Sequence, residues 1–410
     1  MNYIIFPPEA VVQDTIYIIS SKSISNRMLV IRSLAGSDAL LENLSQSDDT
    51  RLMFKALNDT TPTRDVGHAG TAMRFLTACF AVRGGPVVLT GSDRLRQRPV
   101  GPLVDALRSL GAGIEYPGKE GFPPVRITRK LTRGGEVTVR GDVSSQFISA
   151  LMMIGPVLEG GLRIRLRGEV VSDTYLRMTL RLMNRCGIEA NFAGDLIRIP
   201  EQPYRVEPMR VESDWSAASY WYMVAAMLPG SEITLPGLTT DSLQGDSVIM
   251  KLFEPLGVKT RPGEEGITLV SEDTRLPERF EQDFTGCPDL VQTCACTLCA
   301  LGVRFRFTGT RTLRIKETDR IAALQKELSR LGFVLKAGAE GTWIAWEGDR
   351  CEPEASPVIG TYHDHRMAMS FAPLAVRFPG MAVRNPMEVT KSYPAFWDHM
   401  RQAGFRAEEG

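Results

Sequence analysis

The 410-residue chain repeats one pattern six times, and this repeat constrains its fold more than any other feature. Each copy has a polar loop, an apolar run of helical length, a glycine or turn, and a short run rich in β-branched residues. The copies begin near Ser21, His68, Ser144, Asp214, Pro288 and His363. The last five starts lie 70 to 76 residues apart, by subtraction of these positions, and the first interval is shorter. Such a chain is expected to fold as six similar β/α units.

A second helix is predicted after the apolar run of each copy. In the fifth copy, Ile321, Leu324, Leu328 and Leu331 fall on one helical face. Gly332 follows at the position where many helices end in a left-handed residue. The first helix of each copy is apolar on nearly every side and should be buried, whereas the amphipathic second helix should lie outside.

The length of the chain indicates how the six units are divided. A single hydrophobic core stops growing at roughly 250–300 residues. Six units therefore divide more plausibly into two lobes of three than into one layer. The charged, proline-containing stretch 200–209 separates the third copy from the fourth, and we interpret it as a crossover between lobes.

Composition narrows the classes of function. The chain has 48 basic and 48 acidic side chains, and this neutral balance argues against general binding to nucleic acid or anionic membranes. Apolar runs stay well short of the roughly 20 residues of a membrane helix, and residues 1–12 lack the basic segment of a signal peptide. Seven cysteines, an odd number, make no disulfide framework. We therefore expect a cytoplasmic protein.

The polar loops before the buried helices carry many cations. Free N–H groups and the helix dipole make a helix start favourable for anions, so cations gathered there oppose the dipole. Arg matches carboxylate or phosphate with a planar fork, and Lys acts as a point charge. The pattern therefore predicts a polyanionic ligand held between lobes. The cations are Lys22, Arg27, Arg74, Arg94, Arg96, Arg98, Lys316, Arg320, Arg366 and Lys391.

Ordinary structural roles remain alternatives for several polar residues. A run of charges is commonly a solvated loop, a polar residue before a helix is commonly an N-cap, and alternating charges at a helix start commonly form ion pairs. These alternatives apply to Arg94, Arg96 and Arg98, to Ser144, Ser145, Gln146 and Asp289, and to residues 316–320, respectively.

Metal binding receives little support from the sequence. His363 and His365 lack a third ligand at a recognisable spacing. Cys294, Cys296 and Cys299 lie in an apolar helix, where residues two apart face different ways. We interpret these cysteines as buried side chains and predict no metal site.

Seven short motifs follow one another along nearly the whole chain. They are residues 21–27 (SKSISNR), 69–74 (AGTAMR), 98–99 (RP), 143–147 (VSSQF), 244–246 (QGD), 316–320 (KETDR) and 364–368 (DHRMA). Together they resemble the EPSP synthase family of enolpyruvyl transferases, and the combination of the first motif with the last two is highly specific.

This resemblance implies an α/β fold, a two-lobed inside-out α/β barrel of six repeated βαβαββ units. Each lobe would hold three units, with buried helices and the sheets outside. The N-terminal lobe would comprise residues 20–210, and the C-terminal lobe residues 1–19 and 211–410, including the N-terminal strand. The active site is expected in the cleft between the lobes.

The resemblance also implies an activity, the transfer of the enolpyruvyl group of phosphoenolpyruvate to the 5-hydroxyl of shikimate 3-phosphate with release of phosphate. C3 of phosphoenolpyruvate gains a proton as C2 takes the hydroxyl, and the resulting methyl later loses one, so groups act as acid and then as base. The resemblance implies no metal or organic cofactor, because fixed cations do the electrostatic work. It implies a monomer that binds two small anionic substrates, no nucleic acid and no membrane, and that glyphosate inhibits in competition with phosphoenolpyruvate.

Roles carry over by position, and Asp289 resembles the group that takes the 5-hydroxyl proton. The implied catalytic residues are Lys22, Asp289, Glu317 and His365. The implied phosphoenolpyruvate contacts are Lys22, Gly70, Arg98, Gln146, Arg320, Arg366 and Lys391. The implied shikimate 3-phosphate contacts are Lys22, Ser23, Arg27, Ser144, Ser145, Gln146, Ser172, Tyr175, Asp289 and Lys316.

Four sites depart from the family pattern, namely His68, Phe75, Thr312 and the pair Ile19-Ser20. They affect loop shape and affinity more than reaction type, since every charged position is kept.

Two other functions are alternatives. One is a catalytically impaired phosphoshikimate-binding paralogue, against which the retained catalytic residues argue. The other is a UDP-N-acetylglucosamine enolpyruvyl transferase, whose mobile loop typically carries a Cys, whereas residues 92–101 contain none.

Overall fold

The computed structural model describes residues 1–142 and 144–410, which form two compact units. One unit comprises Ser20–Val211, and the other combines Met1–Ile19 with Glu212–Gly410. In the described residues 200–208, which precede the change of unit, the chain has neither helix nor strand.

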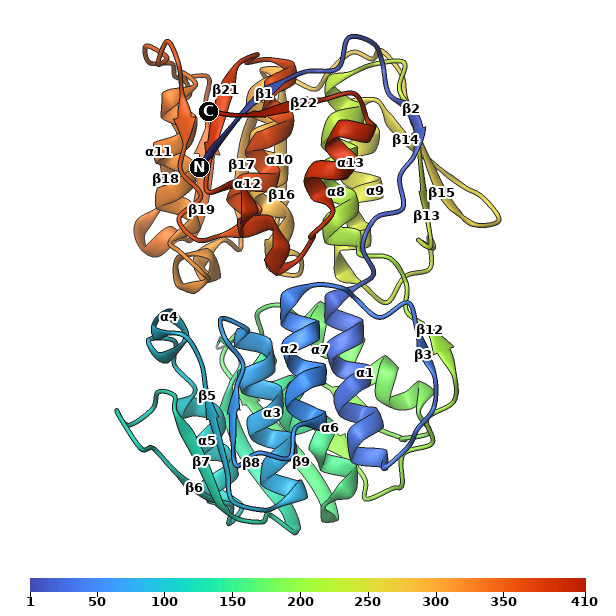
Figure 1. The fold of residues 1–410 in the computed structure, drawn as a ribbon, viewed down its shortest axis with the longest axis vertical. Helices are drawn as coiled ribbons and strands as arrows, with labels where there is room; N and C mark the ends of the chain where they lie inside the picture. Colours follow the sequence, from blue (N-terminus) through green and yellow to red (C-terminus); the bar gives the residue numbers. More distant parts are fainter. Residues whose placement is uncertain (143) are drawn as a thin grey trace. The chain divides into compact units, whose positions relative to one another are not determined.

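The Ser20–Val211 unit contains two four-stranded sheets and one short two-stranded sheet (Figure 1). The strand orders are β4-β5-β7-β6, β10-β11-β9-β8 and β12-β3. The strands are β3 (Leu41–Glu42), β4 (Thr63–Asp65), β5 (Val87–Thr90), β6 (Gly113–Glu115), β7 (Val125–Arg129), β8 (Arg133–Arg140), β9 (Glu159–Arg167), β10 (Asn191–Ala193), β11 (Leu196–Ile199) and β12 (Met209–Arg210). The helices are α1 (Lys22–Ala35), α2 (Asp48–Asn58), α3 (Gly70–Arg83), α4 (Asp93–Arg96), α5 (Gly101–Ser109), α6 (Ser145–Ile154) and α7 (Asp173–Arg185).

The other unit contains three four-stranded sheets, ordered β20-β21-β1-β22, β14-β15-β13-β2 and β16-β17-β19-β18. The strands are β1 (Asn2–Phe6), β2 (Gln13–Thr15), β13 (Glu232–Pro236), β14 (Val258–Pro262), β15 (Gly266–Ser271), β16 (Arg279–Asp283), β17 (Arg304–Thr308), β18 (Lys336–Ala337), β19 (Trp343–Trp346), β20 (Val358–Ile359), β21 (Met381–Arg384) and β22 (Arg406–Glu409). The helices are α8 (Trp215–Met227), α9 (Ile249–Phe253), α10 (Val291–Leu301), α11 (Arg320–Arg330), α12 (His365–Phe371) and α13 (Phe396–Gln402). Short 3₁₀ turns η4 (Pro288–Leu290), η5 (Arg311–Ile315) and η8 (Pro386–Lys391) lie near the candidate site.

The two ends of the chain meet in one sheet of this unit. β1 pairs antiparallel with β21, where Tyr3 lies opposite Val383, and with β22, where Ile5 lies opposite Ala407. The sheet therefore combines the first and last strands of the chain, which lie about 400 residues apart in sequence.

The buried helices predicted from the repeat, and the outer sheets implied by the family resemblance, are confirmed. α8 buries every residue except Ser216, and α12 buries all seven of its residues. The amphipathic α7 and α11 bury only one side, as their spaced apolar residues require. Within each unit the apolar helices form the core and the sheets cover it (Figure 1).

The predicted two-lobed α/β architecture is confirmed, and among the described strands its six repeats correspond to five four-stranded sheets and one two-stranded sheet. The narrow sheet belongs to the first of the six repeats, whose strand β3 pairs only with β12 among the described strands. β3 ends just before Asn43, which has a φ of 56°. The side-chain amide of Asn43 donates to the carbonyl of Val211 at 2.8 Å. Within the described ranges, no helix is long and apolar enough to cross a membrane.

Candidate active site

Arg320 is the centre of a charged cluster in the Glu212–Gly410 unit. It opens α11 and is only 1% exposed. Its Nε donates to Asp364 Oδ2 at 2.7 Å, and its Nη1 to Asp289 Oδ1 at 3.0 Å. Its Nη2 donates to Glu317 Oε2 at 3.0 Å. Burial opposes its charge, but these carboxylates prevail and raise the pKa of Arg320 above its ordinary value.

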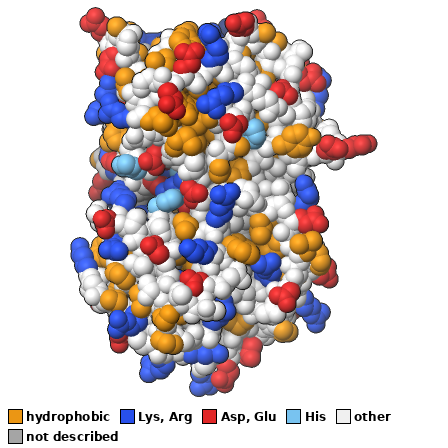
Figure 2. Space-filling view, viewed as in Figure 1, with side chains coloured by type: hydrophobic (Ala, Val, Ile, Leu, Met, Phe, Trp, Pro, Cys, Tyr) orange, Lys and Arg blue, Asp and Glu red, His pale blue; other side chains and the backbone are white. Residues whose placement is uncertain are grey.

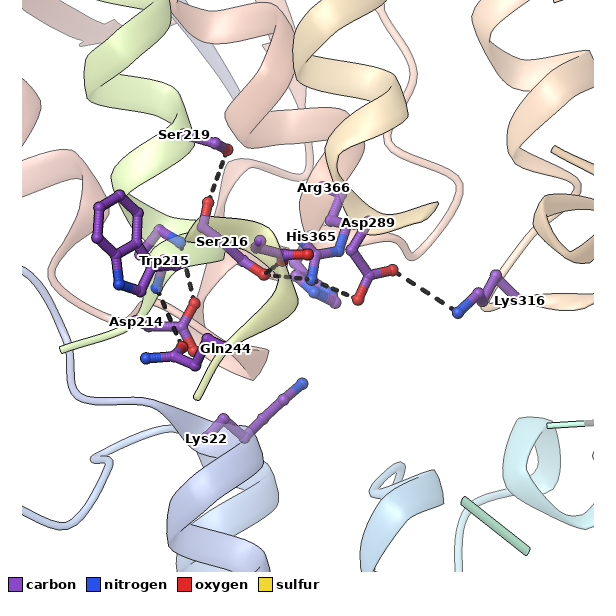
Figure 3. Close-up of polar contacts among 12 residues, drawn as sticks. Lys22, Asp214, Trp215, Ser216, Ser219, Gln244, Asp289, Lys316, His365 and Arg366 are labelled. Carbon is purple, nitrogen blue, oxygen red and sulfur yellow. Dashed lines mark hydrogen bonds and ion pairs between the residues drawn. The ribbon is translucent and has the colours of Figure 1, made fainter. Parts of the chain in front are cut away.

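Asp289 lies in η4 and contacts three cations of this cluster, of which Figure 3 labels Arg366 and Lys316. Its Oδ2 accepts from Arg366 Nη2 at 2.9 Å, and its Oδ1 lies 3.7 Å from Lys316 Nζ. Burial by itself raises the pKa of this carboxyl, but Arg366, Lys316 and Arg320 lower it well below the usual range. Asp289 is therefore ionised and able to accept a hydrogen bond.

A second contact links η8 to the cluster. Lys391 Nζ lies 3.5 Å from Glu317 Oε1, and the Lys391 side chain is 9% exposed. Glu317 thus lies against Lys391 with one oxygen and against Arg320 with the other. The structure therefore brings together all of the predicted charged residues of this unit.

The sequence analysis expected an anionic ligand beside the cations at the helix starts. In the structure, carboxylates of the same chain already lie beside these cations. Asp364 caps α12 by accepting from Arg366 N at 2.9 Å, and the same carboxylate binds Arg320. Asp319 caps α11 through the N–H groups of its first turn. The sequence analysis did not assign Asp364, although its place beside His365 in the DHRMA motif was a usable indication.

Asp246 is a second residue that sequence reasoning missed. It is 3% exposed and accepts a short hydrogen bond from Ser216. Ser216 also accepts from Arg366 Nη2 at 3.2 Å, and Figure 3 shows the contacts of Arg366 with Ser216 and Asp289. Asp246 therefore connects through Ser216 and Arg366 to Asp289. Burial, with a smaller contribution from Asp289, raises the pKa of Asp246 to about 7.

His365 and His363 do not act together. His365 is buried, whereas the His363 ring is 80% exposed and lies 2.8 Å from Glu388 Oε1.

Burial raises the pKa of Cys294 and of Cys296 well above the ordinary thiol value. These cysteines are therefore neutral thiols packed in the core.

In the Ser20–Val211 unit, Lys22 is the first residue of α1, which Ser21 caps. Its Nζ lies 3.5 Å from Asp49 Oδ2, a carboxylate in α2 that the sequence analysis did not assign. Ser23 is half-buried, and its backbone carbonyl accepts from Arg27 Nη1 at 2.9 Å.

Arg27 lies deeper than a direct ligand contact would suggest. It is 2% exposed, and its Nε donates to Thr179 Oγ1 at 2.6 Å. Its guanidinium also donates to Ser149 and lies 5.3 Å from the centre of the Phe75 ring. Burial lowers the pKa of Arg27 to about 10. The Phe at position 75 therefore covers a buried cation.

Gly70 opens α3 directly beneath a guanidinium. A Cβ at this position would lie 2.5 Å from Arg98 Nη1 and 3.0 Å from Arg74 Nη1. Arg74 Nη1 donates to Gln146 Oε1 at 2.7 Å, and Gln146 Nε2 donates to Thr71 Oγ1 at 3.0 Å. Gly70, Arg98 and Gln146 are therefore parts of one polar group in the same unit.

The loop that carries Arg94, Arg96 and Arg98 was given a second interpretation, that of a solvated charged loop. Arg94 and Arg96 are exposed, and Arg96 Nη1 lies 3.6 Å from Asp93 Oδ1, whereas Arg98 is half-buried over Gly70. The solvated-loop alternative therefore describes the first two arginines and not the third.

The remaining predicted residues lie at the starts of α6 and α7. Ser144 caps α6 by accepting from Gln146 N at 3.4 Å, and Ser145 is the first residue of that helix. Ser172 precedes α7 with a φ of 58°, and its carbonyl accepts from Tyr175 N at 3.1 Å. The first residue of the VSSQF motif, at position 143, lies outside the described residues.

Three of the departures from the family pattern lie at these loops or near η5. His68 Nε2 lies 4.0 Å from Asp48 Oδ2. The carbonyl of Ile19 accepts from Asp214 N at 2.8 Å, which ties it to the cap of α8. The buried hydroxyl of Thr312 has no hydrogen-bond partner among the described residues.

The fold and these clusters define a class, an α/β repeat protein whose helix starts place cations and ionised carboxylates for anionic ligands. The sequence model of the EPSP synthase (3-phosphoshikimate 1-carboxyvinyltransferase) family matches residues 59–400, and the chain belongs to this family.

Curated relatives agree over the full length. A 3-phosphoshikimate 1-carboxyvinyltransferase from Bacteroides fragilis (strain YCH46) is 49% identical over 411 residues, covering 100% of both chains. One from Shewanella halifaxensis (strain HAW-EB4) is 35% identical, covering 97% of this chain and 98% of its own. The solved structure of EPSP synthase from Acinetobacter baumannii shares the fold, with a TM-score of 0.77, 21% identity and full coverage of both chains.

Proposed function

We propose that this chain transfers the enolpyruvyl group of phosphoenolpyruvate to the 5-hydroxyl of shikimate 3-phosphate and releases phosphate. The family match over residues 59–400 and the full-length relatives named for this reaction support the proposal. The reaction belongs to the shikimate pathway, which leads to chorismate and the aromatic amino acids.

The observation that carries the proposal is the cluster around Arg320. Both substrates are anions, and the cluster has four cations, Arg320, Arg366, Lys316 and Lys391, against three carboxylates, Asp289, Glu317 and Asp364. A phosphate or carboxylate would find fixed donors there, with little reorganisation at the moment of reaction. We assign Arg320, Arg366 and Lys391 to phosphoenolpyruvate, and Lys316 with Asp289 to shikimate 3-phosphate.

Asp289 would take the proton of the 5-hydroxyl as its oxygen bonds to C2 of phosphoenolpyruvate. Its pKa is low because three cations face it. When substrate anions share those cations, the lowering weakens, and burial raises the pKa of Asp289. The carboxylate would therefore become a stronger base as the substrates bind.

Glu317 and Lys22 would carry the protons of C3. One gives C3 a proton during addition, and a base removes a proton from the new methyl while the C2–O bond to phosphate breaks. Lys391 and Arg320 each lie against one oxygen of Glu317, which fixes the orientation of its carboxylate for this role. We place His365, buried beside Asp364 at 3.9 Å, in a supporting role at the same helix start.

The Ser20–Val211 unit would supply further substrate contacts. Arg98, Gly70 and Gln146 are assigned to phosphoenolpyruvate. Ser23, Ser144, Ser145, Ser172, Tyr175 and Arg27 are assigned to shikimate 3-phosphate, with Lys22 and Gln146 contacting both substrates. The guanidinium of Arg27 donates to Thr179 and Ser149, so it would act mainly by shaping this region.

We further propose a monomer in the cytoplasm with no macromolecular partner. All seven cysteines are free thiols, as suits a reducing compartment. On the face shown in Figure 2, basic and acidic side chains are interspersed, so that face offers no broad basic patch to nucleic acid.

The test is to mix the purified chain with both substrates and follow phosphate release, identifying the enolpyruvyl product by mass spectrometry. We expect release only when shikimate 3-phosphate and phosphoenolpyruvate are both present, and none with UDP-N-acetylglucosamine as acceptor. Arg320→Lys should abolish most turnover, because one ammonium does not reproduce a fork facing three carboxylates. The matched control is Arg311→Lys, at an exposed arginine of η5 that pairs with Glu340. Wild type without product would refute the proposal.

A further inference from the structure

The turn before α12 has an unusual backbone. Two consecutive residues, Tyr362 and His363, have φ values of 55° and 56°. Residues with a Cβ rarely adopt this left-handed region, and a strained pair persists only where surrounding contacts hold it. The next three residues are Asp364, His365 and Arg366, so the conformation of the turn sets the position of a cluster segment.

A buried carboxylate holds this turn. Glu327 is 1% exposed and accepts from Gly360 N at 3.0 Å with Oε2. Its Oε1 accepts a short hydrogen bond from the Tyr362 hydroxyl. A Cβ at Gly360 would lie 3.3 Å from both Glu327 Oε1 and Tyr362 Cε2, so glycine permits this close approach.

Helix α11, which carries Glu327, contacts the turn at both of its ends. Arg320 and Glu327 both belong to α11, and residues seven apart lie on one face, two turns apart. Arg320 binds Asp364 just after the strained pair, while Glu327 binds Gly360 and Tyr362 at and before it. α11 therefore contacts the turn at two places, directly at Asp364 through Arg320 and before it through Glu327.

We propose that Glu327 and Tyr362 are positioning residues for the transfer reaction, which hold the turn so that Asp364 meets Arg320 and Arg366 meets Asp289. This rests on the proposed function, because Arg320 and Arg366 are assigned there to phosphoenolpyruvate. Burial, and then the carboxylate of Glu327, raise the pKa of Tyr362, so its hydroxyl remains a donor.

Other contacts to the turn are peripheral. Arg330 Nε lies 3.0 Å from Glu327 Oε2, but this arginine also reaches outward to Glu354 at 2.7 Å. His363 contacts Glu388 with a ring that is 80% exposed, where ion pairs contribute little. Glu354→Gln therefore serves as a matched control, since it changes a carboxylate of the same network without touching the turn.

The variants that test the proposal are Tyr362→Phe and, as a second one of equal size, Glu327→Gln. We expect KM for phosphoenolpyruvate to rise roughly fivefold to tenfold, as part of a charged hydrogen bond is lost. KM for shikimate 3-phosphate should stay within about twofold, since Lys316 and Arg320 still hold Asp289 when Arg366 shifts. Glu354→Gln should leave both constants unchanged.

A measurement independent of turnover completes the test. Hydrogen exchange of the peptide spanning 360–371 should quicken in Tyr362→Phe, because the N–H of Arg366 depends on Asp364, while α10 stays protected. A drop in kcat with unchanged KM values and unchanged exchange at 360–371 would overturn the proposal. If wild type transferred nothing, the proposed function would fall, and exchange would still decide whether Glu327 and Tyr362 hold the turn.

Discussion

The contact between Gly70 and Arg98 allows one substitution to be worked out in detail. In Gly70→Ala the new methyl would lie 2.5 Å from Arg98 Nη1. Ordinary contact begins at 3.4 Å, so the guanidinium must retreat by about 0.9 Å, the difference of these distances. The flexible arginine is the part that moves, because α3 fixes the backbone of Gly70.

The expected cost falls on substrate binding and not on folding. A hydrogen bond to a charged group contributes about 1.5–3 kcal/mol, and each 1.4 kcal/mol is about tenfold in affinity. Moving Arg98 away from the phosphoenolpyruvate position should therefore raise KM for that substrate roughly tenfold or more. Ala is the better helix former by up to about 1 kcal/mol, so Tm should be unchanged or slightly higher.

The assay compares Gly70→Ala with Gly101→Ala. Gly101 also opens a helix of the same unit, but its added Cβ would meet only Gly121, at 3.4 Å from its Cα. We expect the control to keep the wild-type KM for phosphoenolpyruvate. An unchanged KM in Gly70→Ala, or an equal rise in both variants, would refute the reasoning.

Glyphosate provides a second measurement on the same pair of variants. We predict inhibition of wild type in competition with phosphoenolpyruvate, and a larger loss of inhibition than of substrate binding in Gly70→Ala. The reason is that the inhibitor is longer and would need the space that the methyl and the displaced Arg98 occupy. Inhibition curves at matched ratios of phosphoenolpyruvate to its KM decide it, and a wild type already insensitive at millimolar inhibitor would contradict the prediction.

Three further predictions concern single side chains. Asp289→Asn and Glu317→Gln should each lower kcat by about a hundredfold or more with little change in shikimate 3-phosphate binding; near-normal turnover would remove their catalytic assignment. Asp246 has a pKa raised to about 7, so its contribution to stability is present below its ordinary pKa of 3.8 and is lost as pH rises through 7. The difference in Tm between Asp246→Asn and wild type should therefore shift in favour of the variant from pH 5 to 7 and level off above pH 8. A difference that does not change with pH would contradict this. Thr179→Val should destabilise the fold by about 1–3 kcal/mol in denaturant unfolding, because the buried Nε of Arg27 loses its acceptor at 2.6 Å, and an unchanged midpoint would argue otherwise.

Much of the fold followed from local pattern. Whether a helix is apolar all round or on one side is a property of adjacent residues, so the burial of α8 and the one-sided burial of α11 were predictable. The cations of the candidate site were predictable for a similar reason, since they stand in short motifs at helix starts. The roles of these residues in catalysis stay predictions.

Contacts between distant segments were not predictable in this way. β3 ends before the left-handed Asn43, whose side chain donates a hydrogen bond to Val211, 168 residues away. Arg27 carries a charge like the other loop cations, yet it is buried against Thr179, 152 residues on. A sequence motif does not predict which side chains of other helices will contact its residues.

The charge balance at Arg320 shows most clearly what the sequence determines and what only the tertiary structure decides. The sequence by itself determined that a helix begins just after Lys316 and Glu317, because an N-cap and an amphipathic run follow within one segment. Only the tertiary structure decided that Asp289 and Asp364 neutralise Arg320. Asp289 lies in η4, 31 residues away, and Asp364 lies at the start of α12, 44 residues away. The physical reason is that a buried guanidinium requires carboxylates at hydrogen-bond distance, and only the packing of α10, α11 and α12 in one core brings those separate loops together.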